Sequence, residues 1–171
     1  MAPDWRIEPL ARHHPRKHFA CGEPELDDYL ARYARQHQES GVARIFLAVD
    51  DAQPERVLGY HALAMGSIAK THLPAEDAKR FPSFPLPVAR VVRLAVDRSV
   101  QGQGLGDHLL MDALFRCLRV ANDVGLVAVV IDAKHERARS FYARYEFTRL
   151  PGQPLTLWLP ITTLRLLFAG Q

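Results

Sequence analysis

The stretch RLAVDRSVQGQGLG, residues 93–106, decides the fold. It joins an apolar run, residues 89–97, which predicts a strand, to an amphipathic run, residues 104–122, which predicts a helix. Alternating glycines occupy the turn between them: Gly102, Gly104 and Gly106. Glycine permits positive φ and close backbone approach, and the first N–H groups of a helix lack intrahelical partners and favour an anion. The stretch therefore predicts a pyrophosphate cradle at a helix start; a plain glycine-rich connection is the alternative for this turn taken alone.

Two familiar nucleotide-binding motifs do not fit this turn. The dinucleotide fingerprint needs G-x-G-x-x-G, whereas these glycines recur at every second residue. The P-loop needs Gly-Lys-Ser/Thr, and the chain has Gly106-Asp107 there instead.

The rest of the chain alternates helical and extended patterns around this turn. Residues 25–38 predict a helix that Gly41 ends, and residues 104–122 a helix capped by Gly125. The proline-rich residues 70–87 predict a long ordered loop, or a short helix with an extended run, rather than a core element. Further strands are expected at 45–49, 57–66, 126–132 and 155–160, and short helices at 136–145 and 164–168. Because two early strands are adjacent, the pattern predicts a mixed α/β sheet rather than an all-parallel one.

Composition limits the class of protein. With 171 residues, 48% of them hydrophobic and 24% charged, the chain fits one globular domain over residues 1–171. It has no secretory signal pattern and no apolar run near ~20 residues, so we expect a cytoplasmic protein that does not span a membrane. Two cysteines suggest free thiols, and the histidines show no metal-ligand spacing, so we expect no metal. The net charge of +3 permits a polyanionic partner without requiring one.

Two motifs carry a resemblance to a known family. Gln101-x-x-Gly104-x-Gly106 resembles the Q/R-x-x-G-x-G/A acetyl-CoA motif of the GNAT N-acetyltransferases, and residues 138–147 are similar to the family's A-x-x-F-Y-x-x-x-G-F. The resemblance covers residues 45–159 and implies a central mixed sheet flanked by helices. It implies acetyl-CoA as cofactor, bound by Leu94, Ala95, Val96, Gln101, Gly102, Gln103, Gly104, Leu105, Gly106, His135, Ala138 and Phe141. The chain departs from the pattern at His135, where the family often has Asn, and at Glu146, where it has Gly.

A narrower resemblance comes from segments outside the two motifs. Residues 19–30 (FACGEPELDDYL), Gly59-Tyr60, the run 93–97 and Asp132-Ala133-Lys134 resemble the acetyltransferase toxins of bacterial toxin–antitoxin modules. That resemblance implies acetylation of the α-amino group of aminoacyl-tRNA, which blocks translation, and neutralisation by a ribbon-helix-helix antitoxin. It also points to a homodimer.

The chemistry needs a proton donor for the leaving thiolate and a neutral amine. Tyr142 is the candidate general acid, because a phenol of pKa ~10 is protonated at neutral pH while a thiol has a pKa of ~8.5; Tyr145, three residues on, is the competitor. A lysine acceptor (~10.4) costs about 3–4 kcal/mol more to deprotonate than an α-amine (~7.7–8.0). The motifs show no carboxylate pair or His–Glu group to act as base. His61 and His135 are possible bases, but a lone histidine is usually structural or on the surface, so an α-amine fits somewhat better.

Basic residues gather around the two motifs and suit an RNA acceptor stem: Arg90, Arg93, Lys134, Arg137, Arg139 and Arg144. Solvated surface charge and grip on the cofactor's phosphates are the alternatives for each residue. For the whole chain, the alternatives are an acetyltransferase of a small-molecule or protein amine, and a non-catalytic acyl-CoA-binding domain.

Overall fold

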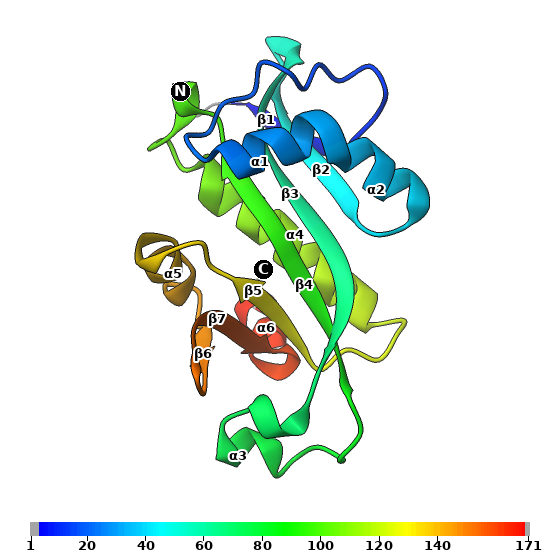
Figure 1. The fold of residues 1–171 in the computed structure, drawn as a ribbon, viewed down its shortest axis with the longest axis vertical. Helices are drawn as coiled ribbons and strands as arrows, with labels where there is room; N and C mark the ends of the chain where they lie inside the picture. Colours follow the sequence, from blue (N-terminus) through cyan, green and yellow to red (C-terminus); the bar gives the residue numbers. More distant parts are fainter. Residues whose placement is uncertain (1–3, 170–171) are drawn as a thin grey trace. The chain divides into compact units, whose positions relative to one another are not determined.

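The computed structural model describes residues 4–169. Its strands are β1 (Trp5–Pro9), β2 (Arg44–Asp50), β3 (Gln53–Ile68), β4 (Leu86–Val96), β5 (Ala128–Asp132), β6 (Thr148–Leu150) and β7 (Gln153–Pro160). Within residues 4–169 these seven strands form one sheet in the order β1-β2-β3-β4-β5-β7-β6 (Figure 1). The β4–β5 pair is parallel, and the β1–β2, β2–β3, β5–β7 and β6–β7 pairs are antiparallel. The predicted mixed α/β sheet is confirmed.

The helical segments come between and after the strands. They are α1 (Pro24–Asp28), the π-helical η1 (Tyr29–Tyr33), α2 (Ala34–Ser40), η2 (Lys70–His72), α3 (Ala75–Ala78), η3 (Arg98–Val100), α4 (Leu105–Ala121), α5 (Glu136–Ala143) and α6 (Ile161–Phe168). No helix in the described range is long and apolar enough to cross a membrane. The chain divides into two compact units whose boundaries fall inside β3, β4 and α4, and the prediction of a single domain stays a prediction.

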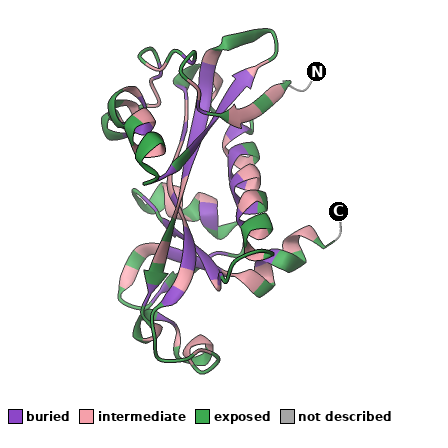
Figure 2. Ribbon diagram, turned by 90° about the vertical axis from the view of Figure 1, so that its right-hand side faces the viewer, coloured by how far each residue is buried: buried purple, intermediate pink, exposed green. Residues whose placement is uncertain are grey.

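Unit 1 comprises residues 4–64 and 92–113. One of its cores packs the α1–η1–α2 run on the strands, through buried residues such as Leu26, Leu30, Ile45 and Tyr60. A second core joins the start of α4 to β2 and β3, through Ala48, Leu58, Leu105 and Leu109. The helical run and α4 are therefore fixed by separate apolar clusters, and Figure 2 shows the buried residues concentrated on the strands.

Unit 2 comprises residues 65–91 and 114–169. Its strands pair in register, with Val88 opposite Ala128 in the parallel pair and Val130 opposite Trp158 in the antiparallel one. The same residues form a core with Ile68, Leu73, Leu86 and Leu150. The proline-rich segment 70–87 contains η2 and α3 followed by an irregular run, which agrees with the predicted short helix and extended run. Leu73 and the partly buried Phe81 belong to this core, so the expectation that the segment lies outside the core was wrong.

Three local predictions were wrong or incomplete. Strands β1 and β6 were missed because each is short and lacks an apolar pattern of its own. β1 is extended because it pairs with β2, and β6 because it pairs with β7. Gly125 was predicted to cap the long helix, but α4 ends at Ala121 and the left-handed glycines do not include Gly125. Gly41 does end its helix, with φ 84°.

Candidate active site

The cradle, residues 101–106, sits between β4 and α4 as predicted. Gly102 and Gly104 have φ values of 80° and 91°, and a Cβ at either glycine would meet no heavy atom within 4 Å. Among residues 4–169 no hydrogen bond is made by the backbone N–H groups of residues 101–106, and the first helical bond there runs from His108 N–H to the Gly104 carbonyl. The turn therefore offers free N–H groups at the positive end of a 17-residue helix, which suits an anion.

Asp97 anchors this turn, a role that sequence reasoning missed. Its carboxylate, 8% exposed, accepts hydrogen bonds from Ala20 N–H (3.0 Å), Ser99 N–H (3.0 Å) and Ser99 Oγ (2.7 Å). Burial opposes ionisation of Asp97, but the bonds from Ala20 and Ser99 outweigh burial and lower its pKa below the ordinary value. The signal available in the sequence was an Asp two residues before Ser, the pattern of an Asx-turn.

Gln101 serves the same turn through its side chain. Its Nε2 donates to the Cys21 carbonyl (2.8 Å) and to the Val96 carbonyl (2.9 Å). The amide thus ties the cradle to β4 and to the loop before α1. The contact with acetyl-CoA predicted for Gln101 stays a prediction, and the structure gives this side chain a holding role of its own.

The end of β4 approaches β3 closely. Ala95 is buried, whereas Leu94 and Val96 are partly buried against the core formed with Leu105. A Cβ on Gly59 would lie 2.9 Å from the Ala95 carbonyl oxygen and 2.9 Å from Leu109 Cδ1. Glycine at this residue is therefore required by the close packing of β3 against β4 and α4.

The tyrosine helix, α5, carries the second motif and lies in unit 2. His135 is its N-cap: Nδ1 accepts a hydrogen bond from Ala138 N–H at 3.2 Å. The imidazole thus takes the capping role that Asn commonly fills. After the helix, Glu146 stands where the family motif has glycine and adopts φ 72°, so the backbone keeps the left-handed turn with a non-glycine residue.

Tyr142 is the buried tyrosine of this helix. It is 7% exposed and lies between the rings of Phe141 (5.2 Å) and Phe147 (6.3 Å), whereas Tyr145 is partly exposed and contacts Phe141 at 5.8 Å. Within residues 4–169 no hydrogen bond is made by the Tyr142 hydroxyl. Burial raises the pKa of this phenol to about 12, so it is protonated throughout the physiological range.

The basic residues predicted to contact RNA have different surroundings. Arg90 pairs with Asp132 (3.0 Å) and Arg139 with Glu136 (2.7 Å). Arg144 lies over the Phe141 ring at 5.1 Å, and Lys134 and Arg137 are exposed. Arg93, in unit 1, stacks on the Tyr29 ring at 3.7 Å. The RNA-binding roles stay predictions, and the charges of Arg90 and Arg139 are already compensated by carboxylates.

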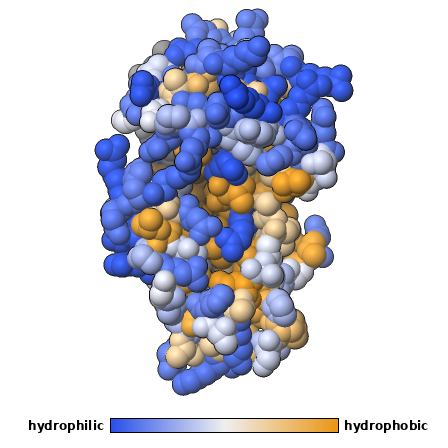
Figure 3. Space-filling view, viewed as in Figure 1, coloured by the Kyte–Doolittle hydropathy of each residue, from blue (hydrophilic) through white to orange (hydrophobic). Residues whose placement is uncertain are grey.

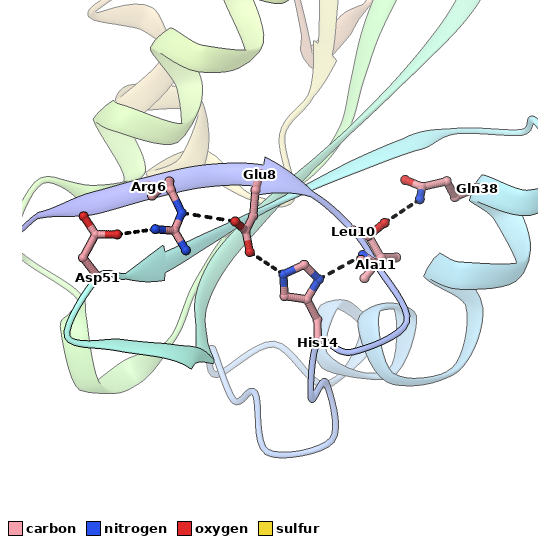
Figure 4. A network of polar contacts seen from close by, with 7 residues as sticks. All are labelled: Arg6, Glu8, Leu10, Ala11, His14, Gln38 and Asp51. Atoms are coloured by element: carbon pink, nitrogen blue, oxygen red, sulfur yellow. Dashed lines mark hydrogen bonds and ion pairs between the residues drawn. The ribbon is translucent and has the colours of Figure 1, made fainter.

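The structure also gathers Glu8, His13 and His14, whose ligating atoms lie within 4.8 Å of one another. Figure 4 shows Glu8 and His14 of this group. His14 Nδ1 accepts from Ala11 N–H (2.9 Å), so the proton is on Nε2, which faces Glu8 Oε1 at 2.6 Å. This hydrogen bond lowers the pKa of Glu8. A metal would need the unprotonated Nε2, so hydrogen bonding accounts for the cluster, and the expected absence of metal stays a prediction.

The cysteines are not activated for nucleophilic chemistry. Both are free, and burial raises the pKa of Cys21 to about 11 and that of Cys117 to about 12. A thiolate nucleophile needs the opposite shift.

Residues 41–149 match the model of the acetyltransferase (GNAT) domain. The chain belongs to this family. It is 44% identical over 141 residues to the tRNA-acetylating toxin of Mycobacterium tuberculosis, with 82% of each chain covered. Two solved structures are similar over 96% of this GNAT chain. One is AtaT complexed with acetyl-methionyl-tRNAfMet (30% identity, TM-score 0.89, 99% of that chain covered). The other is a tyrosine-to-phenylalanine variant of AtaT bound to the C-terminus of the antitoxin AtaR and acetyl-CoA (28%, 0.82, 98%).

Proposed function

We propose that this GNAT chain is an acetyl-CoA-dependent N-acetyltransferase toxin that acetylates the α-amino group of aminoacyl-tRNA and so blocks translation. The observation that carries the proposal is the 44% identity to a tRNA-acetylating toxin over 82% of both chains. That alignment is longer than the 109-residue span 41–149 of the GNAT domain match, so it includes segments beyond the cofactor motif.

The cradle supports acetyl-CoA as the acetyl donor. Free N–H groups at residues 101–106, open space at Gly102 and Gly104, and the start of α4 suit the pyrophosphate. Main-chain groups of Leu94, Ala95 and Val96 on β4 would hold the arm that carries the thioester, with His135, Ala138 and Phe141 as further contacts. When bound, acetyl-CoA supplies an acetyl group activated as a thioester.

Tyr142 would act as the general acid. Its phenol keeps its proton at neutral pH because burial raises the pKa to about 12, and no partner within residues 4–169 competes for the hydroxyl. This phenol is a weaker acid than a thiol of pKa ~8.5, so it would donate its proton as the C–S bond breaks, and the phenolate would regain a proton from the nitrogen of the acetylated amine. Tyr145 is the less suitable donor because it is partly exposed.

The acceptor is proposed to be an α-amine on acidity grounds. An α-amine of pKa ~7.7–8.0 loses its proton near neutral pH, whereas a lysine amine needs about 3–4 kcal/mol of help. The carboxylates beside the tyrosine helix, Asp132 and Glu136, are paired with arginines. The amine would therefore reach its neutral form in solution.

The remaining proposals concern context. The protein would act in the cytoplasm as a homodimer, with residues 1–171 as one functional domain, and a ribbon-helix-helix antitoxin would neutralise it. The complex of AtaT with the C-terminus of the antitoxin AtaR supports the antitoxin partner. The RNA would be held by basic side chains: Arg90, Arg93, Lys134, Arg137, Arg139 and Arg144.

The test is a transfer assay with labelled acetyl-CoA and purified protein. Charged tRNA, uncharged tRNA, free amino acids and a lysine peptide are offered in parallel. We expect label in charged tRNA alone, and mild alkaline release of the amino acid should yield an N-acetylated product. Label only in free amines or peptide would replace the proposal with a different acceptor, and no acetyl consumption would leave a non-catalytic acyl-CoA-binding domain.

A further inference from the structure

The helical run before β2 contains a π-helical segment at one place. Residues Tyr29–Tyr33 form η1 between α1 and α2, and the cap N–H of Ala34 bonds back to the Tyr29 carbonyl. A π-segment costs hydrogen-bond geometry and is found frequently at functional sites. The residue at its start, Tyr29, is 3% exposed, and its hydroxyl is within hydrogen-bond distance of His37 Nδ1 at 3.0 Å. The ring is therefore held from both ends.

Arg93 uses this ring as a platform. Its guanidinium carbon lies 3.7 Å from the centroid of Tyr29, which is close enough for face-to-face contact. Tyr29 packs in turn on Tyr60 at 6.4 Å with nearly parallel planes. The stack Arg93–Tyr29–Tyr60 thus ends in a cation supported by a buried aromatic pair, and all three residues belong to unit 1.

Within residues 4–169, the N–H groups of the Arg93 guanidinium have no acceptor. Among the described residues no carboxylate lies within ion-pair distance of Arg93, and no hydrogen bond from its guanidinium is made. Arg90 differs, because its Nη1 donates to Asp132 at 3.0 Å, and so does Arg139, because its Nε donates to Glu136 at 2.7 Å. A stacked guanidinium of this kind has lost side-chain entropy but keeps a planar set of N–H donors for an external acceptor.

We infer that Arg93, stacked on Tyr29, is a prebuilt phosphate fork that grips a backbone phosphate near the acceptor end of the RNA substrate. The inference rests on the proposed function, since it names the group that would hold that substrate. A bidentate guanidinium matches phosphate geometry, and the aromatic support fixes its plane. Figure 3 shows mainly hydrophilic side chains over the α1–α2 region, which suits a polar ligand rather than an apolar partner.

The same chemistry could come from the 3′-phosphate of coenzyme A, so the experiment separates the two sources. Three ligands are titrated against the full chain: an uncharged tRNA, coenzyme A and dephospho-coenzyme A. Arg93→Ala removes the fork, and Arg93→Lys keeps the charge but loses both the planar donors and the stack. Arg35→Ala is the matched control, because Arg35 is a surface arginine of α2 paired with Glu39 at 3.0 Å.

We expect Arg93→Ala to weaken tRNA binding by about 10–100-fold and to reduce the slope of log K against log salt by about 0.7–0.9. Arg93→Lys should weaken binding less and keep the slope, while Arg35→Ala should change neither. Both forms of the coenzyme should bind as in the wild type. If Arg93→Ala instead weakens coenzyme A but not its dephospho form, or leaves tRNA affinity unchanged, the inference is wrong.

A failure of the proposed function would give a different experimental result from a failure of the phosphate fork. Wild-type protein that transfers no acetyl group to charged tRNA removes the proposed function, whatever Arg93 does. Wild-type protein that acetylates charged tRNA while Arg93→Ala binds tRNA normally removes the phosphate fork alone. Thermal unfolding of each variant shows that it is folded, and Arg93→Lys, which keeps a long cationic chain in place, provides the answer if Arg93→Ala does not fold.

Discussion

The cradle turn, residues 97–106, differs from the tyrosine helix, α5 with its flanking residues, in the part of the chain that is proposed to act: backbone N–H groups in the turn and a side chain in the helix. In the cradle turn, the side chains of Asp97 and Gln101 tie the loop. The backbone N–H groups of residues 101–106 make no hydrogen bond within residues 4–169, so they would be available to the proposed ligand. In the tyrosine helix, the His135 side chain caps the first turn by accepting a hydrogen bond from Ala138 N–H, and the group proposed to act in catalysis is the side-chain hydroxyl of Tyr142.

This difference explains where the chain follows the family motif and where it departs. Free N–H groups need the backbone itself to turn, so the chain has the motif glycine at Gly104, where φ is 91°, and a further glycine with positive φ at Gly102. A cap needs only an acceptor at the right distance, so His135 can replace Asn. The turn after α5 needs a left-handed residue but no approaching ligand, so Glu146 can occupy it with φ 72° at some cost in stability.

The largest expected effect separates side-chain chemistry from backbone binding. Tyr142→Phe should lower the rate of acetyl transfer by about 10²–10⁴-fold, because it removes the proton donor. The affinity for acetyl-CoA should hardly change, since the cradle is proposed to bind it through backbone N–H groups. Single-turnover transfer to charged tRNA and calorimetric titration with coenzyme A measure the two quantities.

Tyr145→Phe is the matched control, because it removes a hydroxyl from the turn directly after the same helix. It should keep transfer within about threefold of wild type. Comparable losses in the two variants, or near-normal turnover in Tyr142→Phe, would contradict the assignment of the general acid. Since the pKa of Tyr142 is about 12, the wild-type rate should show no loss from phenol ionisation up to about pH 10.

The second prediction concerns the loss of a side chain that supports the cradle, the carboxylate of Asp97. Asp97→Asn should lower the free energy of unfolding by about 2–3 kcal/mol, because a buried carboxylate with charged hydrogen bonds becomes a neutral amide. The folded pKa of Asp97 is depressed, so its contribution is complete above the unfolded pKa of ~3.9 and is lost as pH falls through the folded value.

Urea unfolding across pH checks both parts of this prediction. The gap between wild type and Asp97→Asn should be constant from pH 5 to 7 and should narrow below about pH 4. A gap that grows on acidification would have the wrong sign. Coenzyme binding to Asp97→Asn should weaken as well, because the turn that presents the N–H groups loses its anchor.

Sequence reasoning found the parts of the fold whose local pattern agrees with the final structure. The strand, glycine turn and long helix around residues 89–122 were predicted because apolar spacing and positive-φ glycines are local properties. The short strands β1 and β6 are fixed by their partners, as Trp5 opposite Asp50 and Thr148 opposite Trp158 show. Pairing of that kind cannot be derived from a five-residue or three-residue run.

The candidate site divides in the same way. The cradle glycines and the choice of Tyr142 follow from motifs, but the roles of Asp97 and Gln101 depend on Ala20 and Cys21, about 80 residues away in the chain. The contrast between Arg90 and Arg93 also depends on residues far away in the chain. Arg90 pairs with the carboxylate of Asp132 on β5, whereas Arg93 stacks on the ring of Tyr29 in η1. Charge counting from the sequence treats the two arginines as equivalent.

The third prediction tests whether the His135 cap is interchangeable. His135→Ala should lower stability by about 1 kcal/mol, or about 2–4 °C in Tm for a chain of this size, because Ala138 N–H loses its acceptor. His135→Asn should restore most of the loss, since Asn is among the preferred caps. If the asparagine variant is no better than alanine, the imidazole contributes through something other than capping.

The smallest expected effect concerns the same backbone geometry in the two regions. Glu146→Gly should raise the free energy of unfolding by about 0.5–1 kcal/mol, because relief of the left-handed strain exceeds the added freedom of the unfolded chain.

Gly102→Ala is the converse change at φ 80°, where a Cβ meets nothing within 4 Å, so its loss of about 1 kcal/mol reports backbone strain alone. Thermal and urea unfolding measure both, with Glu146→Ala as the control for the lost carboxylate. The cradle is proposed to bind the coenzyme through its backbone, and the turn after α5 is given no such role, so only Gly102→Ala should also weaken coenzyme binding. Equal binding losses in Gly102→Ala and Glu146→Gly would mean that the two turns do not differ in the way their residues indicate.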